Sequence, residues 1–127
     1  MSPVGIAADR KGRIYVADAG NKRVQILDRE GNYLSEFKVD GWQDVVFNEP
    51  YLDIDEKGDV YLTDPPGHRA LRYSNEGKLL GALKPSEAGK PLLQFPMGIA
   101  VEKDGPWVYL VDCRNHMIRK FSKRDFR

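Results

Sequence analysis

Apolar and polar residues alternate along most of the chain, in short segments that are separated by turn residues. Between residues 5 and 37 the alternating segments are 5–9, 13–18, 23–27 and 33–37. They are rich in β-branched and aromatic residues, and Lys-Gly, Gly-Asn and Glu-Gly-Asn sequences lie between them. This pattern, with a turn signal about every 8–12 residues, is typical of antiparallel strands. The sequence therefore predicts four strands, named a, b, c and d in chain order.

The same pattern occurs three times. Each copy opens on a proline, at Pro3, Pro50 and Pro96, and the period is 46 to 48 residues. Glycine and aspartate recur in register at Gly12, Gly58 and Gly105 and at Asp18, Asp64 and Asp112. The second copy predicts strands at 51–55, 59–64, 70–74 and 78–83, and the third at 98–102, 107–112 and 117–121. The repeats span about 3–46, 50–92 and 96–127, and the third lacks a strand d.

A four-stranded sheet per repeat, at a period in the mid-forties, predicts blades of a β-propeller around a central channel. Solenoid repeats are usually shorter, and no segment requires a helix. We therefore expect an all-β chain that forms one partial propeller domain over residues 1–127.

The repeat also resembles a known family. The stretch "PVGIAADRKGRIYVADAGNKRV" at 3–24 is similar to the motif of NHL-repeat β-propellers, and 50–73 and 96–121 match it with departures. The lead-ins Phe47–Pro50 and Gln94–Pro96 resemble those of the same family. The resemblance implies a ring of six blades and a face that is presented to proteins, RNA or glycans.

Composition narrows the function only slightly. Lys and Arg total 20 and Asp and Glu 19, so a net charge of +1 gives no global attraction to nucleic acid or membrane. The C-terminal residues 123–127, "KRDFR", are typical of a hairpin turn that is cut off before a strand d, and their charge fits a solvated end or alternatively a polyanion contact. The single cysteine excludes an internal disulfide, and no apolar run approaches the ~20 residues of a membrane span. The abrupt start of the pattern suggests a fragment of a longer protein.

The turn between strands b and c carries the most distinctive residues of each repeat. An Asp at the end of strand b can accept hydrogen bonds from the following turn, and an Arg can pair with its carboxylate. Asn or Gly suits a turn position with positive φ. The predicted structural network consists of Asp18, Asn21, Arg23, Asp64, Asp112 and Asn115.

The third b–c turn, "DCRNHM" at 112–117, departs from this scheme. Met117 stands where the first two repeats have Arg23 and Arg69, so either Arg119 replaces that arginine or the turn is less rigid. Cys113 and His116 resemble metal ligands, but no third and fourth ligand lie near them in the sequence, so we expect no metal and no cofactor.

Two further residues are candidates for a functional role, Asp53 because it breaks the repeat and Trp42 because of its place in a long connection. Asp53 stands where strand a otherwise has Ala7 and Ala100, in the strand that lines a propeller channel. It fits a solvated channel residue, or a ligand or metal contact. Trp42 lies in the long connection 38–49, and it fits either a binding anchor or a seal between neighbouring blades.

In a propeller, the b–c turns and the d–a connections open on the same face. We expect that face to bind a partner, with these candidate residues: Trp42, Lys22, His68, Arg69, Arg114 and His116. The leading hypothesis is a non-catalytic interaction module whose partner is a protein. The alternatives are a fragment of a propeller enzyme, lyase-like or lactonase-like with a metal at the channel, and an RNA-binding module. The sequence does not indicate a cellular compartment.

Nearly three blades make only about half of a ring. An open fan exposes the apolar faces of its two end sheets, and such faces favour association. We therefore expect either further blades in a longer chain or self-association, with two copies in C2 symmetry supplying about six blades.

Overall fold

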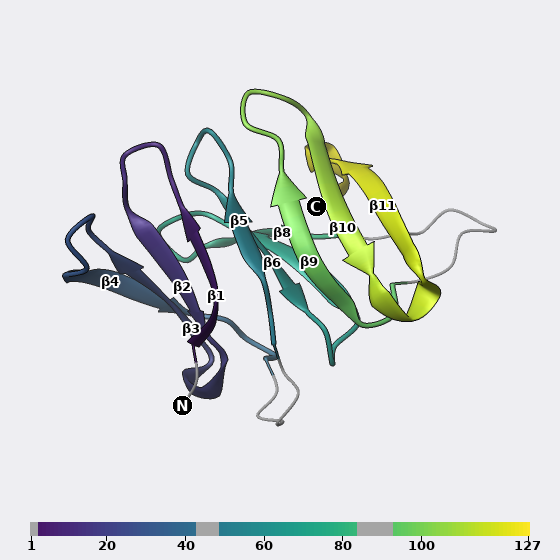
Figure 1. Cartoon of the computed structure of the whole chain (residues 1–127), viewed down its shortest axis with the longest axis horizontal. Coiled ribbons are helices and arrows are strands. Elements are labelled where there is room, and N and C mark those ends of the chain that lie inside the picture. Colours follow the sequence, from purple (N-terminus) through teal and green to yellow (C-terminus); the bar gives the residue numbers. More distant parts are fainter. Residues whose placement is uncertain (1–2, 43–48, 84–92) are drawn as a thin grey trace.

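The computed structural model describes residues 3–42, 49–83 and 93–127, and in these residues the chain forms three antiparallel sheets arranged as a fan (Figure 1). Each sheet is a simple meander of neighbouring strands. The first sheet contains β1 (Pro3–Ala8), β2 (Ile14–Asp18), β3 (Arg23–Leu27) and β4 (Tyr33–Lys38). The second contains β5 (Leu52–Ile54), β6 (Val60–Asp64), β7 (Arg69–Tyr73) and β8 (Leu79–Ala82). The third contains β9 (Pro96–Val101), β10 (Trp107–Asp112) and β11 (Met117–Ser122).

The predicted all-β fold and the three repeats are confirmed, and the strand boundaries agree with the predicted ones to within one or two residues. In the part of the chain that the structure describes, three short 3₁₀ turns accompany the strands: η1 (Ala19–Asn21), η2 (Cys113–Asn115) and η3 (Lys123–Asp125). Residues 43–48 of the connection 38–49, which include the lead-in residue Phe47, lie outside the described residues. So do residues 84–92 of the connection between the second and third repeats.

The first hairpin turn of each of the first two sheets follows one local rule. In the turn between β1 and β2, Asp9 Oδ1 accepts hydrogen bonds from the backbone N–H groups of Lys11 (2.9 Å) and Arg13 (3.0 Å). Gly12 then closes the turn at φ 83°, a conformation that favours glycine. The corresponding aspartate of the second repeat, Asp55, makes the same two bonds to the residues two and four positions later. The sequence thus encodes these two hairpins locally.

The core lies between the sheets. The first junction, between the first and second sheets, buries Tyr15, Ala17, Val24, Ile26, Phe37, Val39, Trp42, Leu52, Ile54, Val60, Leu62, Leu71 and Tyr73. The second junction, between the second and third sheets, buries Tyr61, Ala70, Leu83, Leu93, Val101, Val108, Leu110 and Phe126. Neighbouring residues of β6 belong to different junctions, because successive side chains of a strand point to opposite faces. The second sheet therefore supports both halves of the core.

The C-terminal segment differs from the predicted hairpin turn. After β11, Ser122 caps η3 in a reciprocal pair with Asp125, and the chain then turns back to the second sheet. Phe126 bridges to Leu83 and is buried in the second junction, and Arg127 N–H donates to Ala82 O (3.2 Å). The third sheet accordingly has three strands, and burial of Phe126 gives these last residues a packing role that their charge pattern did not suggest.

Candidate binding face

The turns after β2, β6 and β10 gather at one edge of the fan, which we call the bc face; it consists of residues 18–23, 64–69 and 112–117 (Figure 1). Each turn starts with an aspartate that ends a strand, and all three aspartates are buried. A buried carboxylate is costly unless hydrogen bonds and an opposite charge compensate it. The contacts of these carboxylates therefore decide which side chains of the face remain available for binding.

In the first turn, Asp18 Oδ2 accepts hydrogen bonds from Asn21 Nδ2 (3.0 Å) and Arg23 Nε (2.9 Å). Burial alone would raise the pKa of Asp18, but the bonds from Asn21 and Arg23 outweigh it, and the net shift of this pKa is downward. Among the described residues, Oδ1 of Asp18 has no hydrogen-bond partner. The carboxylate thus stays charged and holds the turn together.

The other two turns repeat this network with local substitutions. Asp64 accepts from Arg69 Nε (2.7 Å), and Asp112 accepts from Asn115 Nδ2 (2.8 Å) and from Gln94 N–H (2.8 Å). Arg119 Nη1 lies 3.1 Å from Asp112 Oδ2, so Arg119 makes the ion pair that the arginines of the first two turns make. Residues two apart on a strand share a face, which allows Arg119 to reach the carboxylate in place of Met117.

The expectation about positive φ is wrong by one residue. The left-handed residue of each turn is Lys22 (φ 54°), His68 (φ 56°) or His116 (φ 55°), and not the preceding Asn or Gly. The preceding position serves the carboxylate instead. Asn21 and Asn115 donate side-chain hydrogen bonds to their aspartates.

Gly67 stands at that preceding position in the second turn. It donates its backbone N–H to Asp64 Oδ1 (3.3 Å), and a Cβ at Gly67 would overlap the carboxylate. Close approach to Asp64 therefore accounts for the glycine, whereas its φ does not.

The charged and histidine residues among the binding candidates differ in whether their side chains are accessible or engaged in contacts within the chain. Lys22, His68, Arg114 and His116 are exposed on the bc face. Arg69 is engaged, because it pairs with Asp64 and donates from Nη2 to Asp40 O (2.8 Å). The accessible charge of the three turns is therefore positive, while their aspartates are buried.

Phe95 joins the second and third turns, and sequence reasoning missed its part in the face. Its backbone N–H donates to His68 Nδ1 (2.9 Å), and the two rings meet edge to face at 6.5 Å. The Arg114 guanidinium stacks over the Phe95 ring, with its carbon 4.6 Å from the ring centroid. The sequence signal was the "QFP" lead-in, which suggested a family feature but not a contact between sheets.

Trp42 does not lie on the surface. Its side chain is 1% exposed, and Nε1 donates to Thr63 O (3.3 Å) in the second sheet. The indole closes the first junction, so the hypothesis of an exposed binding anchor is wrong for this residue. Removal of a large ring from water, with its N–H satisfied, favours the buried position.

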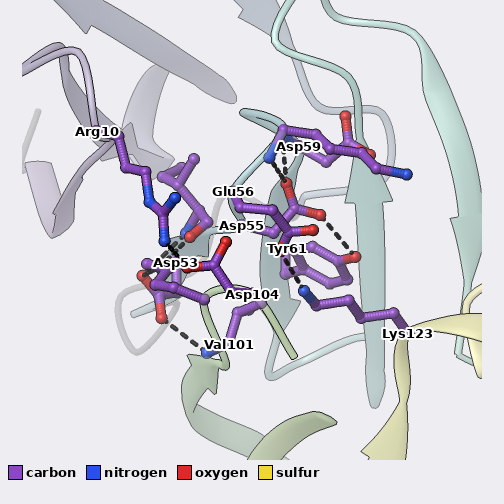
Figure 2. Close-up of polar contacts among 12 residues, drawn as sticks. Arg10, Asp53, Asp55, Glu56, Asp59, Tyr61, Val101, Asp104 and Lys123 are labelled. Carbon is purple, nitrogen blue, oxygen red and sulfur yellow. Dashed lines mark hydrogen bonds and ion pairs between the residues drawn. The ribbon is translucent and has the colours of Figure 1, made fainter. Parts of the chain in front are cut away.

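Asp53 contacts the neighbouring sheet on the side of the fan where β5 and β9 approach each other (Figure 2). Its Oδ2 accepts from Val101 N–H (2.7 Å) in β9, and its Oδ1 lies 3.1 Å from Lys103 Nζ. Lys103 also donates to Ile54 O. The carboxylate is therefore paired with the third sheet, a role that neither of its two interpretations, a solvated channel residue and a ligand or metal contact, describes.

The edge opposite the bc face is held by ion pairs between sheets (Figure 2). Arg10 of the first sheet pairs with Asp104 of the third, and Glu56 of the second accepts from Lys123 Nζ at 2.6 Å. The hydrogen bond from Lys123 lowers the pKa of Glu56 to about 2. This edge therefore carries paired charges, whereas the bc face presents cations whose acidic neighbours are buried.

Within residues 3–42, 49–83 and 93–127, no three His, Cys, Asp or Glu side chains are placed to hold a metal ion together. Cys113 is exposed and free. No helix in the same residues is long and apolar enough to cross a membrane.

Comparisons with known proteins agree with the repeat pattern. A family model described as NHL repeat matches residues 1–27. Protein brain tumor of Drosophila melanogaster is 29% identical over 115 residues, which cover 88% of this chain and 10% of that protein. The B-box type zinc finger protein ncl-1 of Caenorhabditis elegans is 30% identical over 115 residues, which cover 88% of this chain and 13% of that protein. The chain thus spans about a tenth of the length of these relatives.

Solved structures agree with the fold. A streptogramin B lyase superimposes with a TM-score of 0.60 at 16% identity, covering 94% of this chain and 40% of the lyase. A protein of unknown function from Bacteroides caccae gives a TM-score of 0.69 at 13% identity, covering 94% of this chain and 45% of that one. At these identities the likeness concerns the fold alone. Together with the three repeats, the family model and the relatives show that the chain belongs to the NHL-repeat family, and the solved structures show a propeller-like all-β fold.

Proposed function

We propose that this chain is a non-catalytic binding module whose bc face contacts a partner protein. One observation carries the proposal: the three aspartates of the face are buried and paired, while Lys22, Arg114 and His116 are accessible beside them. A face of this kind offers cationic side chains but no free carboxylate base among its turn residues. Binding is therefore the chemistry that it supports best.

The partner class follows from how few cations are free. Arg23 and Arg69 are held by Asp18 and Asp64, and His68 Nδ1 already accepts a hydrogen bond. Binding along a nucleic-acid backbone uses many unpaired Lys and Arg residues, and the net charge of the whole chain is +1. A protein with an acidic patch is better matched to a small cationic face that also offers Phe95 as a half-buried aromatic surface.

Photo-crosslinking from the middle sheet tests this proposal. In a Cys113→Ser background, Pro66→Cys places a thiol-linked photo-crosslinker on the bc face, and Lys57→Cys places it on the opposite edge of the same sheet. We expect defined protein adducts from position 66 in extracts of the source cells, and none from position 57. Adding Lys22→Glu and Arg114→Glu should reduce the yield at position 66 at least fivefold.

Two results would reject the proposal. Equal adducts from both positions would mean that the bc face has no preference. Adducts that collapse on ribonuclease treatment would identify RNA as the partner and favour the RNA-binding alternative instead.

A further inference from the structure

The two end sheets of the fan expose apolar faces, and the equivalent faces of the sheets inside the fan are packed against a neighbouring sheet. In the third sheet, Val108 and Leu110 are buried in the second junction, so the alternate residues of β10 point away from the fan. Register places Ile118 beside Val111 and Lys120 beside Tyr109. We call this outward side of the third sheet the leading face, and Tyr109, Val111 and Ile118 on it are 38%, 43% and 77% exposed.

The residues that correspond to the leading face in the other two sheets are completely covered. They are equivalent by position in the repeat and by strand register, and each is 0% exposed: Tyr15, Ala17 and Val24 in the first sheet, and Tyr61, Thr63 and Ala70 in the second. Within the fan, this side of a sheet always packs against the following sheet. The leading face is thus half of a junction of the type that the chain forms twice.

The outward side of the first sheet provides the other half of such a junction. Tyr15 and Ala17 point into the first junction, so Ile14 and Val16 point away from it, together with Ile6, which pairs with Val16. We call this outward side of the first sheet the trailing face, and Ile6 is 70% exposed on it. The corresponding residues of the second sheet, Leu52, Val60 and Leu62, are buried against the first sheet.

We propose that two copies of this chain associate head to tail, with the leading face of each copy packed on the trailing face of the other. Each contact repeats the internal junctions, and a twofold axis relates the two contacts, so the assembly closes. The fold leaves room for a second copy, because the matched part is 40% and 45% of two solved chains of the same fold.

Charge does not oppose the contact. The strands β10 and β11 contribute one charged side chain to the leading face, that of Lys120, which pairs in register with Tyr109. Its Nζ lies 4.1 Å from the centroid of the Trp107 ring. The corresponding residue of the second sheet, Arg72, lies in a closed junction, with its guanidinium carbon 5.1 Å from the centroid of the Tyr61 ring. A cation at this position is therefore compatible with a packed junction when a carboxylate pairs with it, as Asp59 does with Arg72 (2.8 Å).

The experiment is sedimentation equilibrium and light scattering of the whole chain over a wide concentration range. We expect a species of about twice the 14.4-kDa chain mass. Ile118→Asp changes the leading face, Ile6→Asp changes the trailing face, and Leu79→Asp changes an exposed apolar residue of the middle sheet as the matched control. Because a carboxylate in an apolar contact is costly, each end-face variant should weaken dimerisation at least about 100-fold, whereas Leu79→Asp should leave it unchanged.

The same variants also test whether the two copies associate head to tail. All three replaced residues are exposed, so circular dichroism should show the same folded spectrum for every variant. In a head-to-tail dimer, a mixture of the Ile118→Asp and Ile6→Asp chains forms one unmodified contact, so it should dimerise more tightly than either variant alone. A monomer at all concentrations, loss of the dimer with Ile118→Asp only, retention of the dimer in both variants, or growth beyond two copies would each overturn the proposal. None of these outcomes bears on the bc face, because the replaced residues lie outside it.

Discussion

In the b–c turns, several single residues together compensate the desolvation of a buried carboxylate. One neighbour donates a side-chain or backbone hydrogen bond, an arginine supplies the opposite charge, and the next residue takes the left-handed conformation. A side chain in that conformation costs about 1 kcal/mol relative to glycine. The first turn retains Lys22 there, at φ 54°, with its side chain exposed on the bc face.

This arrangement predicts that Lys22→Gly stabilises the chain by about 0.5–1 kcal/mol, because it removes the strain. Asn21→Gly should instead destabilise it by about 1 kcal/mol, since Asp18 loses a hydrogen bond. Urea unfolding of both variants measures the two effects. The opposite order would place the strained position at Asn21 and contradict the structure of the turn.

Glu56 provides a prediction on pH. The hydrogen bond from Lys123 lowers its pKa from 4.5 to about 2, so the folded state holds this carboxylate in its charged form. A lowered folded-state pKa adds stability above pH 4.5, which is lost as the pH falls from 4.5 to 2. We expect Glu56→Gln to cost about 1 kcal/mol at pH 7 and almost nothing at pH 2.

Unfolding free energies of wild type and Glu56→Gln between pH 2 and 7 test this expectation. Glu30→Gln replaces an exposed glutamate of the first sheet and serves as the control. A cost that stays constant down to pH 2 would show that the Glu56–Lys123 pair is not its source.

At the scale of elements, sheets are joined by polar contacts as well as by apolar packing. Asp53 in β5 accepts from the backbone N–H of Val101, at a point where β9 begins its turn into β10. A strand that passes a neighbouring sheet has backbone donors that its own ladder does not use, and a buried donor without a partner costs about 1–3 kcal/mol. The aspartate satisfies one such donor.

Asp53→Ala should therefore destabilise the chain by about 2 kcal/mol, since it leaves the Val101 N–H without its acceptor. Asp53→Asn keeps an acceptor oxygen and should cost about half as much. Equilibrium unfolding in urea distinguishes the two variants. Equal costs would mean that charge pairing with Lys103, and not the backbone contact, provides the stabilisation.

At the scale of the whole molecule, the second sheet links the two halves of the core. Its two faces belong to different junctions, so a substitution that destabilises one junction should also lower the stability of the other. Trp42 lies in the first junction and Leu110 in the second, which gives a direct way to measure this coupling.

In a Trp107→Phe background, Trp42 is the remaining tryptophan and its fluorescence reports the first junction. Leu110→Ala should destabilise the second junction by about 2–5 kcal/mol and lower the urea midpoint of the Trp42 signal together with that of circular dichroism. Leu79→Ala, at an exposed position, should leave both midpoints nearly unchanged. An unchanged Trp42 midpoint in Leu110→Ala would show that the two junctions unfold independently.

The sequence by itself determined the strands, the turns and the repeat, because these depend on local rules. Alternation fixed which residues of a strand share a face, and residues such as Asp9 and Gly12 fixed where the hairpins turn. The b–c network could be anticipated for the same reason, since its Asp, its Asn or Gly and its Arg lie within eight residues of one another.

Only the tertiary structure decided the contacts between repeats. Trp42 became buried because the second sheet covers it, and Asp53 acquired Val101 as a partner from a residue 48 positions away. Phe95, His68 and Arg114 meet for the same reason. Such contacts depend on how one sheet lies against the next, which the period of the repeat implies but does not specify residue by residue.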